Sequence, residues 1–171
     1  MSSALVSTLN LAPHPEGGFF VVTHENPLTV PNPFTPTDGD DTTRKASTSI
    51  HYLLTPESPV GHFHRNKAIT YHLHHSGRGR YRLIHEDGRI EEYVVGPDVL
   101  KGERIAWIVE GGVWKSSAVE GDESLLISEV VVPGFEYRDH EFLDWERLVG
   151  LVGEAKAGEW RQLLNAGSRG E

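Results

Sequence analysis

Short segments rich in β-branched and aromatic residues follow one another through the middle of the chain, with Gly, Pro, Asp or Ser between them. Segments of this length and composition are typical of strands. The predicted strands are Ser47–Thr55, Ile69–His75, Gly79–Glu86, Arg89–Gly96, Arg104–Glu110, Val113–Glu120 and Ser124–Pro133. Asp87–Gly88 gives a strong hairpin signal between two of them. Many short strands joined by regular turns predict an all-β protein, an antiparallel sandwich or barrel.

Two segments break this pattern. Asn26–Thr43 contains four prolines and three aspartates, which predicts a long surface loop. After Phe142 the apolar residues take helical spacing, and they predict two short helices at about Asp144–Val152 and Gly153–Asn165. Gly158 weakens the second of these helices, because glycine is a poor helix former.

Length and charge narrow the classes of function. The chain has 171 residues, which suits one compact domain. A formal charge of −9 disfavours nucleic-acid binding, and we interpret Arg78, Arg80 and Arg82 as one solvated face of a strand. No apolar run reaches the roughly 20 residues that span a bilayer, so we expect no membrane partner. The N-terminus also lacks the features of a signal peptide.

The chain has no cysteine. This absence excludes disulfides, thiol catalysis and thiolate ligands, so histidine and carboxylate are the strong metal ligands that remain. It also fits a cytoplasmic location, which we expect.

Five histidines lie between Pro59 and His75, at His62, His64, His72, His74 and His75. On a regular strand His62 and His64 share one face, where neighbouring imidazoles can chelate a metal. His72 and His74 likewise share a face, and His75 points the other way. Strand alternation alone does not say whether His72 and His74 face the core, because a shift of one residue exchanges the two faces.

The order of four motifs resembles a known family. These motifs are PHPEGGFF (Pro13–Phe20), HYLLTPESPVGHFHR (His51–Arg65), GERIAWIVEGGVWKSS (Gly102–Ser117) and VVPGFEYRDHEF (Val131–Phe142). Together they resemble the cupin superfamily, specifically cupin family 5, over roughly Leu9 to Phe142. The resemblance implies an antiparallel jelly-roll β-barrel at about residues 9–142 with an interior pocket, followed by a helical extension at about 143–166. It also implies a homodimer, and a fold similar to that of sugar epimerases and other small-molecule isomerases.

The resemblance also implies where a metal would bind. Cupins that bind a metal supply an H-x-H pair, a carboxylate, and a third histidine from a second motif. His62 and His64 match the pair, but the carboxylate position falls on Thr70, or on Ile69 with one gap, and the third histidine falls on Lys115. Because two of the four ligands are missing, we favour no metal. A site with Zn, Fe, Mn or Ni would need His62, His64 and either His72 or His74.

The alignment without a gap, which we favour, turns Thr70, His72 and His74 into the pocket. The opposite register would place Ile69, Tyr71 and Leu73 there instead. Lys115 would then bind an anionic or carbonyl-bearing substrate, or it is a surface residue, because Trp114 and Lys115 cannot both point inward on a regular strand. His51 is a candidate general base, and Glu16 is either structural or at the pocket rim. The aromatic residues Tyr52, Phe63, Trp107 and Trp114 form either pocket walls or core.

Three functions fit these residues. The one we expect is a metal-free isomerase, epimerase or cyclase that acts on a small molecule. In it, His62, His64, His72 and His51 are the acid–base candidates, Lys115 or Tyr52 would stabilise negative charge, and Thr70 and His74 would contact the substrate. The alternatives are a metal-dependent cupin lyase or oxygenase and a non-catalytic ligand-binding cupin.

Overall fold

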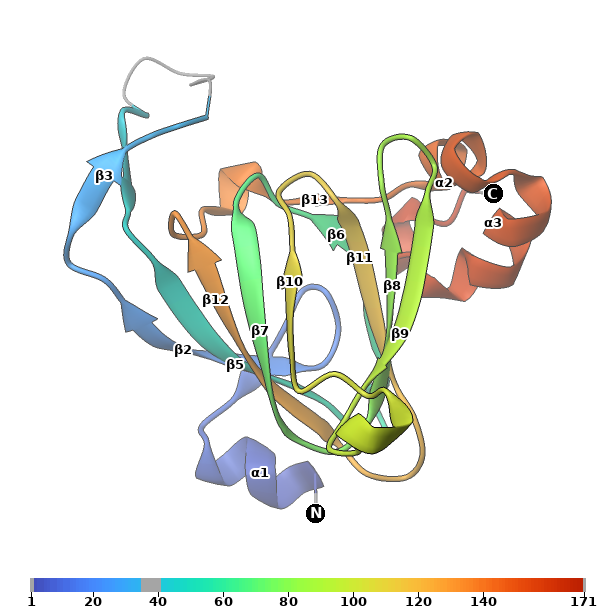
Figure 1. Cartoon of the computed structure of the whole chain (residues 1–171), viewed down its shortest axis with the longest axis horizontal. Helices are drawn as coiled ribbons and strands as arrows, with labels where there is room; N and C mark the ends of the chain where they lie inside the picture. The colour runs from blue at the N-terminus through green and yellow to red at the C-terminus, as the bar shows by residue number, and fades with distance from the viewer. Residues whose placement is uncertain (1, 35–40, 171) are drawn as a thin grey trace.

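Two antiparallel sheets form the body of the protein in the computed structural model, which describes residues 2–34 and 41–170 (Figure 1). The predicted all-β class is confirmed, and every predicted strand is present. The six-stranded sheet has the order β1 (Ala12–Pro13), β2 (Phe19–Glu25), β5 (Thr48–Leu54), β12 (Leu125–Val132), β7 (Ile69–Ser76) and β10 (Ala106–Val109). The five-stranded sheet has the order β13 (Glu141–Phe142), β6 (Val60–Arg65), β11 (Trp114–Val119), β8 (Gly79–Ile84) and β9 (Ile90–Val95).

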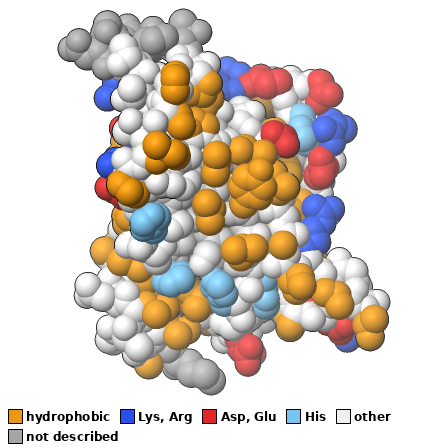
Figure 2. Space-filling view, turned by 60° about the vertical axis from the view of Figure 1, so that its left-hand side comes forward, with side chains coloured by type: hydrophobic (Ala, Val, Ile, Leu, Met, Phe, Trp, Pro, Cys, Tyr) orange, Lys and Arg blue, Asp and Glu red, His pale blue; other side chains and the backbone are white. Residues whose placement is uncertain are grey.

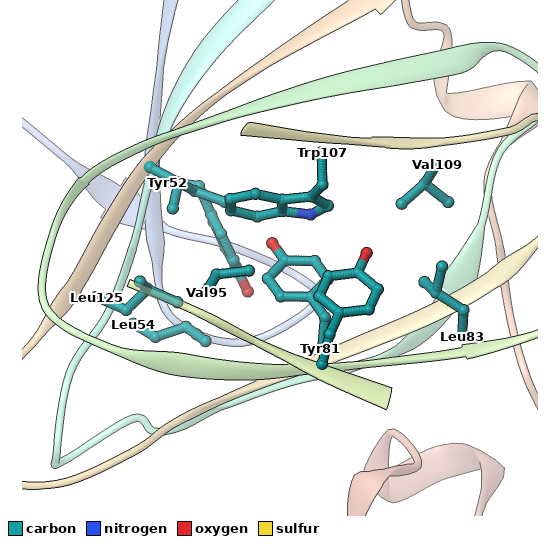
Figure 3. Packing of buried hydrophobic residues seen from close by; sticks show 10 residues of the cluster. Tyr52, Leu54, Tyr81, Leu83, Val95, Trp107, Val109 and Leu125 are labelled. Carbon is teal, nitrogen blue, oxygen red and sulfur yellow. The ribbon is translucent and has the colours of Figure 1, made fainter. Parts of the chain in front are cut away.

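The core between the sheets follows from strand alternation. Every second residue of β12 faces inward, so Leu125, Ile127, Glu129 and Val131 line the interior in that order. Figure 3 shows one end of this interior filled by side chains that include Trp107, Tyr81 and Leu125. The Trp107 and Tyr81 rings meet edge to face with centroids 4.8 Å apart. The other part of the interior, near Glu129 and Val131, holds a cavity.

A second core lies outside the five-stranded sheet. Phe63 of β6 and Trp114 of β11 pack there against the C-terminal segment, which contains α2 (Trp145–Val152) and α3 (Glu154–Trp160) (Figure 1). The first predicted helix is correct to within a residue, and Asp144 caps it by accepting a hydrogen bond from the Arg147 backbone N–H. The second ends earlier than predicted, at Trp160. A 3-10 turn at Arg161–Leu163 follows it and places Leu163 and Leu164 in the same core.

Two further segments differ from the sequence interpretation. The helix α1 (Ser2–Thr8) is not predicted by the pattern of apolar residues. Asn26–Thr43 is not wholly irregular, because β3 (Thr29–Pro31) pairs with β4 (Thr43–Lys45) in a hairpin that projects from the barrel (Figure 1). The buried Arg44 side chain anchors this hairpin by ion pairs with Asp41 and Asp139. Residues 35–40 of the predicted loop lie outside the described residues.

A β-bulge in β6 corrects the predicted histidine pair. In the pairing of β11 with β6, Lys115 lies opposite His64 and Ser117 lies opposite Gly61. Two steps along β11 therefore correspond to three steps along β6. The extra residue breaks the alternation of β6. His64 and Gly61 therefore face the interior while Phe63 packs under the C-terminal helices, and the expectation that His62 and His64 share a face is wrong.

The helical coverage also explains how Trp114 and Lys115 are both buried. Lys115 points into the barrel and Trp114 points out, into the core beneath α2 and α3. The alternative in which Lys115 is a surface residue is therefore wrong. No helix among the described residues is long and apolar enough to cross a membrane.

The C-terminal helices should unfold together with the barrel, because they share a core with it. Leu148→Ala removes a fully buried side chain of α2, and we expect it to lower the free energy of unfolding by about 2–5 kcal/mol in urea denaturation. The matched control is Leu100→Ala, whose side chain is 96% exposed, and it should change the free energy by no more than about 0.5 kcal/mol. Two separate transitions in the Leu148 variant, with the barrel unaffected, would contradict the shared core.

Candidate functional site

A cavity of about 270 Å³ opens into the end of the barrel that the core leaves unfilled. Its lining is partly polar and partly apolar. The polar residues in its lining include His14, Glu16, His64, Asn66, Lys115 and Glu129, and the apolar ones include Phe20, Ile50, Val131 and Phe135. This combination of an apolar wall and a few convergent polar groups is typical of small-molecule sites.

A tight loop before β2 positions Glu16. Gly17 has a φ of +100°, and a Cβ at that position would lie 2.1 Å from the Val60 carbonyl oxygen, so only glycine allows the loop to approach β6 this closely. The His62 backbone N–H donates to the Glu16 carbonyl oxygen at 2.7 Å. The Tyr52 hydroxyl donates to the Gly17 carbonyl oxygen at 2.8 Å. These bonds fix the loop so that the Glu16 side chain enters the barrel.

Three histidines surround the buried Glu16 carboxylate. One Glu16 oxygen lies 2.8 Å from His140 Nε2, and the other lies 3.2 Å from His64 Nε2 and 3.7 Å from His14 Nδ1. Burial acts to raise the pKa of the Glu16 carboxyl, but the nearby His64 and the hydrogen bond from His140 hold it well below its usual range. Glu16 is therefore ionised inside the barrel.

The proton on His64 is fixed by the backbone. His64 Nδ1 lies 2.8 Å from the His62 carbonyl oxygen, and a carbonyl only accepts, so Nδ1 carries the proton. Burial, with Lys115 nearby, lowers the pKa of His64 to about 4 even though Glu16 acts to raise it. In the neutral ring Nε2 presents a lone pair to an ionised carboxylate oxygen. That contact is favourable only when a proton or a cation lies between the two atoms.

Three of these residues, Glu16, His64 and His140, form a trio with the ligand atoms of a metal site. One ligand atom each from Glu16, His64 and His140 lies within 4.8 Å of the other two. A histidine that donates its second ring N–H to a backbone carbonyl, as His64 does, is the usual arrangement of a metal ligand. These residues therefore fit a divalent cation, although they are not the ligand set that the sequence indicates.

A second buried group lies beside this trio. Lys115 Nζ donates to Glu129 Oε2 at 2.8 Å and to His72 Nε2 at 3.0 Å. Burial acts to raise the pKa of the Glu129 carboxyl, but Lys115 and His72 lower it. Burial and the Lys115 charge lower the pKa of His72 to about 3. This ring is therefore neutral, and its Nε2 accepts a hydrogen bond from the Lys115 ammonium. The ammonium of Lys115 is thus compensated by Glu129.

The structure places few of the predicted residues in the cavity. Only His64 of the four acid–base candidates lines it, and only Glu16 and Lys115 of the predicted substrate contacts do. Thr70 and His72 are buried, in the register that the ungapped alignment favours. Tyr52 and Trp107 belong to the filled core, and Phe63 and Trp114 belong to the core under the helices.

Three predicted histidines lie elsewhere. His62 is near Arg169 of the C-terminal segment, and burial lowers its pKa. His74 Nε2 donates to the Gly77 carbonyl oxygen at 2.8 Å, next to a second register shift. His51 is on the outer side of the six-stranded sheet, where it contacts Ser128. The pocket of His62, His64, His72 and His74 does not form, because the bulge in β6 turns His62 away, and His74, opposite Ile127, bonds to Gly77 and does not line the cavity.

Two residues that line the cavity, His14 and Glu129, were missed by the sequence analysis, as was His140, which contacts Glu16. Glu129 had a readable signal, because it is an acid at an inward position between Ile127 and Val131. His14 and His140 had none in their own segments. They meet at Glu16 only when distant parts of the chain come together in the fold.

A small antiparallel barrel with a buried cluster of histidines and carboxylates at one end defines the cupin class of protein. The family profile described as Cupin superfamily (DUF985) matches residues 3–143, and the chain belongs to this family. The uncharacterized protein YML079W of Saccharomyces cerevisiae is 44% identical over 164 residues, which cover 91% of this chain and 82% of the yeast protein.

Solved structures agree with this assignment. A hypothetical protein from Leishmania major is 30% identical with a TM-score of 0.77, covering 87% of this chain and 90% of that one. A Shewanella oneidensis protein is 26% identical with a TM-score of 0.79, covering 95% and 96% of the two chains. An oxalate decarboxylase of Bacillus subtilis is 18% identical with a TM-score of 0.55, covering 90% of this chain and 37% of its own. That last likeness shows the fold alone.

Stability should fall as the solution is acidified, because His72 is buried in its neutral form. Its pKa is about 3 in the folded protein against 6.5 for the free group, so below pH 6.5 the unfolded chain binds a proton that the folded protein does not. The contribution of His72 to the free energy of unfolding is fully present above pH 6.5. It is lost progressively toward pH 3, at up to about 1.4 kcal/mol per pH unit.

Urea denaturation between pH 7 and pH 4 measures this slope. His72→Gln should reduce the slope whatever its effect on total stability, whereas His24→Gln, at an exposed position, should leave it nearly unchanged. An unaltered slope in the His72 variant would show that the ring is protonated in the folded protein.

Proposed function

We propose that the cavity is the active site of an enzyme that moves a proton on a small organic molecule, an isomerase or epimerase type of reaction. The observation that carries the proposal is the fixed tautomer of His64. Its Nδ1 proton is held by the His62 carbonyl oxygen, so Nε2 is a base that borders the cavity. Glu16, 3.2 Å from Nε2, would stabilise the imidazolium that forms when this base takes a proton.

His14 offers the complementary acid. Its Nδ1 accepts a hydrogen bond from the Glu16 backbone N–H at 3.1 Å, so its proton is on Nε2 in the neutral ring. A base at His64 and an acid at His14 within one cavity suit removal of a proton from one atom of a substrate and delivery of a proton to another. The proton taken by His64 then passes through water to His14, which has given one up, so each turnover leaves both rings as they began.

Lys115 would stabilise the negative charge that such a reaction develops. It borders the cavity, and Glu129 balances its charge. An ammonium that is already in position beside a developing enolate or alkoxide lowers the free energy of the transition state that carries this charge. The apolar side of the cavity, with Phe20 and Phe135, would hold the hydrocarbon part of the substrate. We therefore propose a small carbonyl-bearing compound as substrate.

The homodimer expected from the resemblance stays a prediction. The outer side of the six-stranded sheet exposes Tyr71, Leu73 and Ile108, and Figure 2 shows apolar side chains gathered on this side. Pairing through this surface would bury them.

Proton exchange tests the proposed reaction without knowledge of the product. A panel of small ketones, hydroxyketones and 2-oxo acids is incubated with the protein in D₂O, and NMR follows the loss of protons next to the carbonyl. We expect exchange with at least one compound and a decrease of about 10²- to 10⁴-fold in His64→Gln. His24→Gln is the control and should keep the full rate. Exchange that persists unchanged in the His64 variant would exclude this residue as the base.

A metal-dependent cupin reaction is the second candidate, and the Glu16, His64 and His140 trio favours it. These three side chains would hold the cation, with His64 kept in the correct tautomer by the His62 carbonyl oxygen. A bound divalent cation would polarise a carbonyl oxygen or activate water. Lys115 and Glu129 would then orient the substrate beside it.

Cation binding separates the two candidates. Protein freed of metal is titrated with Mn²⁺, Fe²⁺, Zn²⁺ or Ni²⁺, and calorimetry and thermal unfolding are recorded. If the trio holds a metal, a free concentration about 100 times Kd should add about 2.7 kcal/mol of stability. Glu16→Gln and His140→Asn should abolish that gain. Glu25→Gln, which also lines the cavity but lies outside the trio, should retain it. If none of these cations stabilises the protein, the metal-dependent candidate is excluded and the metal-free proton transfer remains.

A further inference from the structure

A second group of histidines lies on the outer side of the six-stranded sheet, away from the cavity. Three neighbouring strands, β5, β12 and β7, each contribute one side chain there: His51, Ser128 and His75. Glu129, the next residue on β12, points into the barrel, so Ser128 faces outward. Figure 2 shows histidine side chains in a row along the border of the apolar surface on this side.

The two rings converge on one point. His75 Nε2 lies 2.6 Å from Ser128 Oγ, and His51 Nδ1 lies 3.0 Å from the same oxygen. The ring centroids are 5.8 Å apart and the rings are nearly perpendicular, at 87°. A hydroxyl has a single proton to donate, so in the hydrogen-bonded arrangement one ring nitrogen accepts from Ser128 and the other donates to it. When the donating ring takes its other tautomer, both nitrogens present lone pairs to the same small volume.

The convergence depends on a local irregularity of the sheet. Between β12 and β7 the pairing passes from Leu126 opposite Ser76 to Ile127 opposite His74. His75 is the extra residue on β7. Such bulges re-aim a side chain and are frequent next to functional sites. His51 needs no such device, because it lies directly opposite Ser128 across β5 and β12.

The surroundings give a cation access to both rings. His75 is exposed and His51 is half-buried, so an ion reaches both without opening the barrel. The chain carries a formal charge of −9, which raises the local concentration of cations.

We propose that His51 and His75 form a surface site for a divalent transition-metal cation that prefers imidazole ligands, such as Zn²⁺, Ni²⁺ or Cu²⁺. The two ring nitrogens are the ligands, the Ser128 hydroxyl lies next to both of them, and water completes the coordination. This site shares no residue with the Glu16, His64 and His140 trio. It makes the outer side of the sheet responsive to metal independently of the reaction in the cavity.

The test must separate this site from the interior one. Protein labelled with ¹⁵N at histidine is titrated with Zn²⁺, and long-range ¹H–¹⁵N spectra follow each imidazole. We expect the His51 and His75 signals to shift together with a single Kd. His51→Asn and His75→Asn should each raise that Kd by about tenfold or more, since loss of a ligand costs at least as much as loss of a supporting contact.

Two control variants keep the experiment decisive. His85→Asn, in the β8–β9 hairpin, should leave the Kd of this site unchanged, and so should Glu16→Gln, which affects only the interior trio. The proposal is overturned if His51 and His75 respond with different Kd values, or if either asparagine variant binds as tightly as the original protein. It is equally overturned if the two signals do not move while the protein takes up zinc.

Discussion

The buried Glu16 carboxylate holds together the three parts of the chain that shape the cavity. It comes from the loop before β2, and it contacts His64 of β6 and His140 just before β13. An ionised carboxylate inside a barrel is costly unless its oxygens are paired. The loop, the strand and the closing segment must therefore meet in one arrangement. The hydrogen bonds from the His62 backbone N–H and the Tyr52 hydroxyl to this loop fix the same arrangement.

The charges of the barrel interior explain why the trio is chemically reactive. Two buried carboxylates, Glu16 and Glu129, share the polar end of the cavity with one buried ammonium, Lys115. Lys115 bonds directly to Glu129, so Glu16 is paired only with histidines, and burial lowers the pKa of two of them, His14 and His64. A bound proton or a divalent cation would balance the negative charge of Glu16. The proton is what the proposed isomerase reaction moves, and the cation is what the metal-dependent reaction requires. Lys115 stands where the family resemblance expects a histidine ligand, so the chain carries a cation of its own at that position.

The strands were predictable because alternation and turn residues are local properties. The seven strands predicted from composition are all present, and α2 begins at Trp145, within a residue of its predicted start. The site was less predictable, because it depends on where alternation fails. A single extra residue in β6 sends His62 outward and leaves His64 inside. His14 and His140 gather around Glu16 only through closure of the barrel end, which no pattern within their own segments records.

The stretch from Pro59 to His75 thus serves both sides of the protein. Its first bulge leaves one histidine, His64, in the cavity with its proton fixed by the backbone. Its second places another, His75, on the outer side of the neighbouring sheet beside His51. A regular β6 would have placed His62 on the same face as His64, as strict alternation implies. Because each bulge costs ladder hydrogen bonds, two of them in one short stretch favour the interpretation that these rings are placed for chemistry and not for packing.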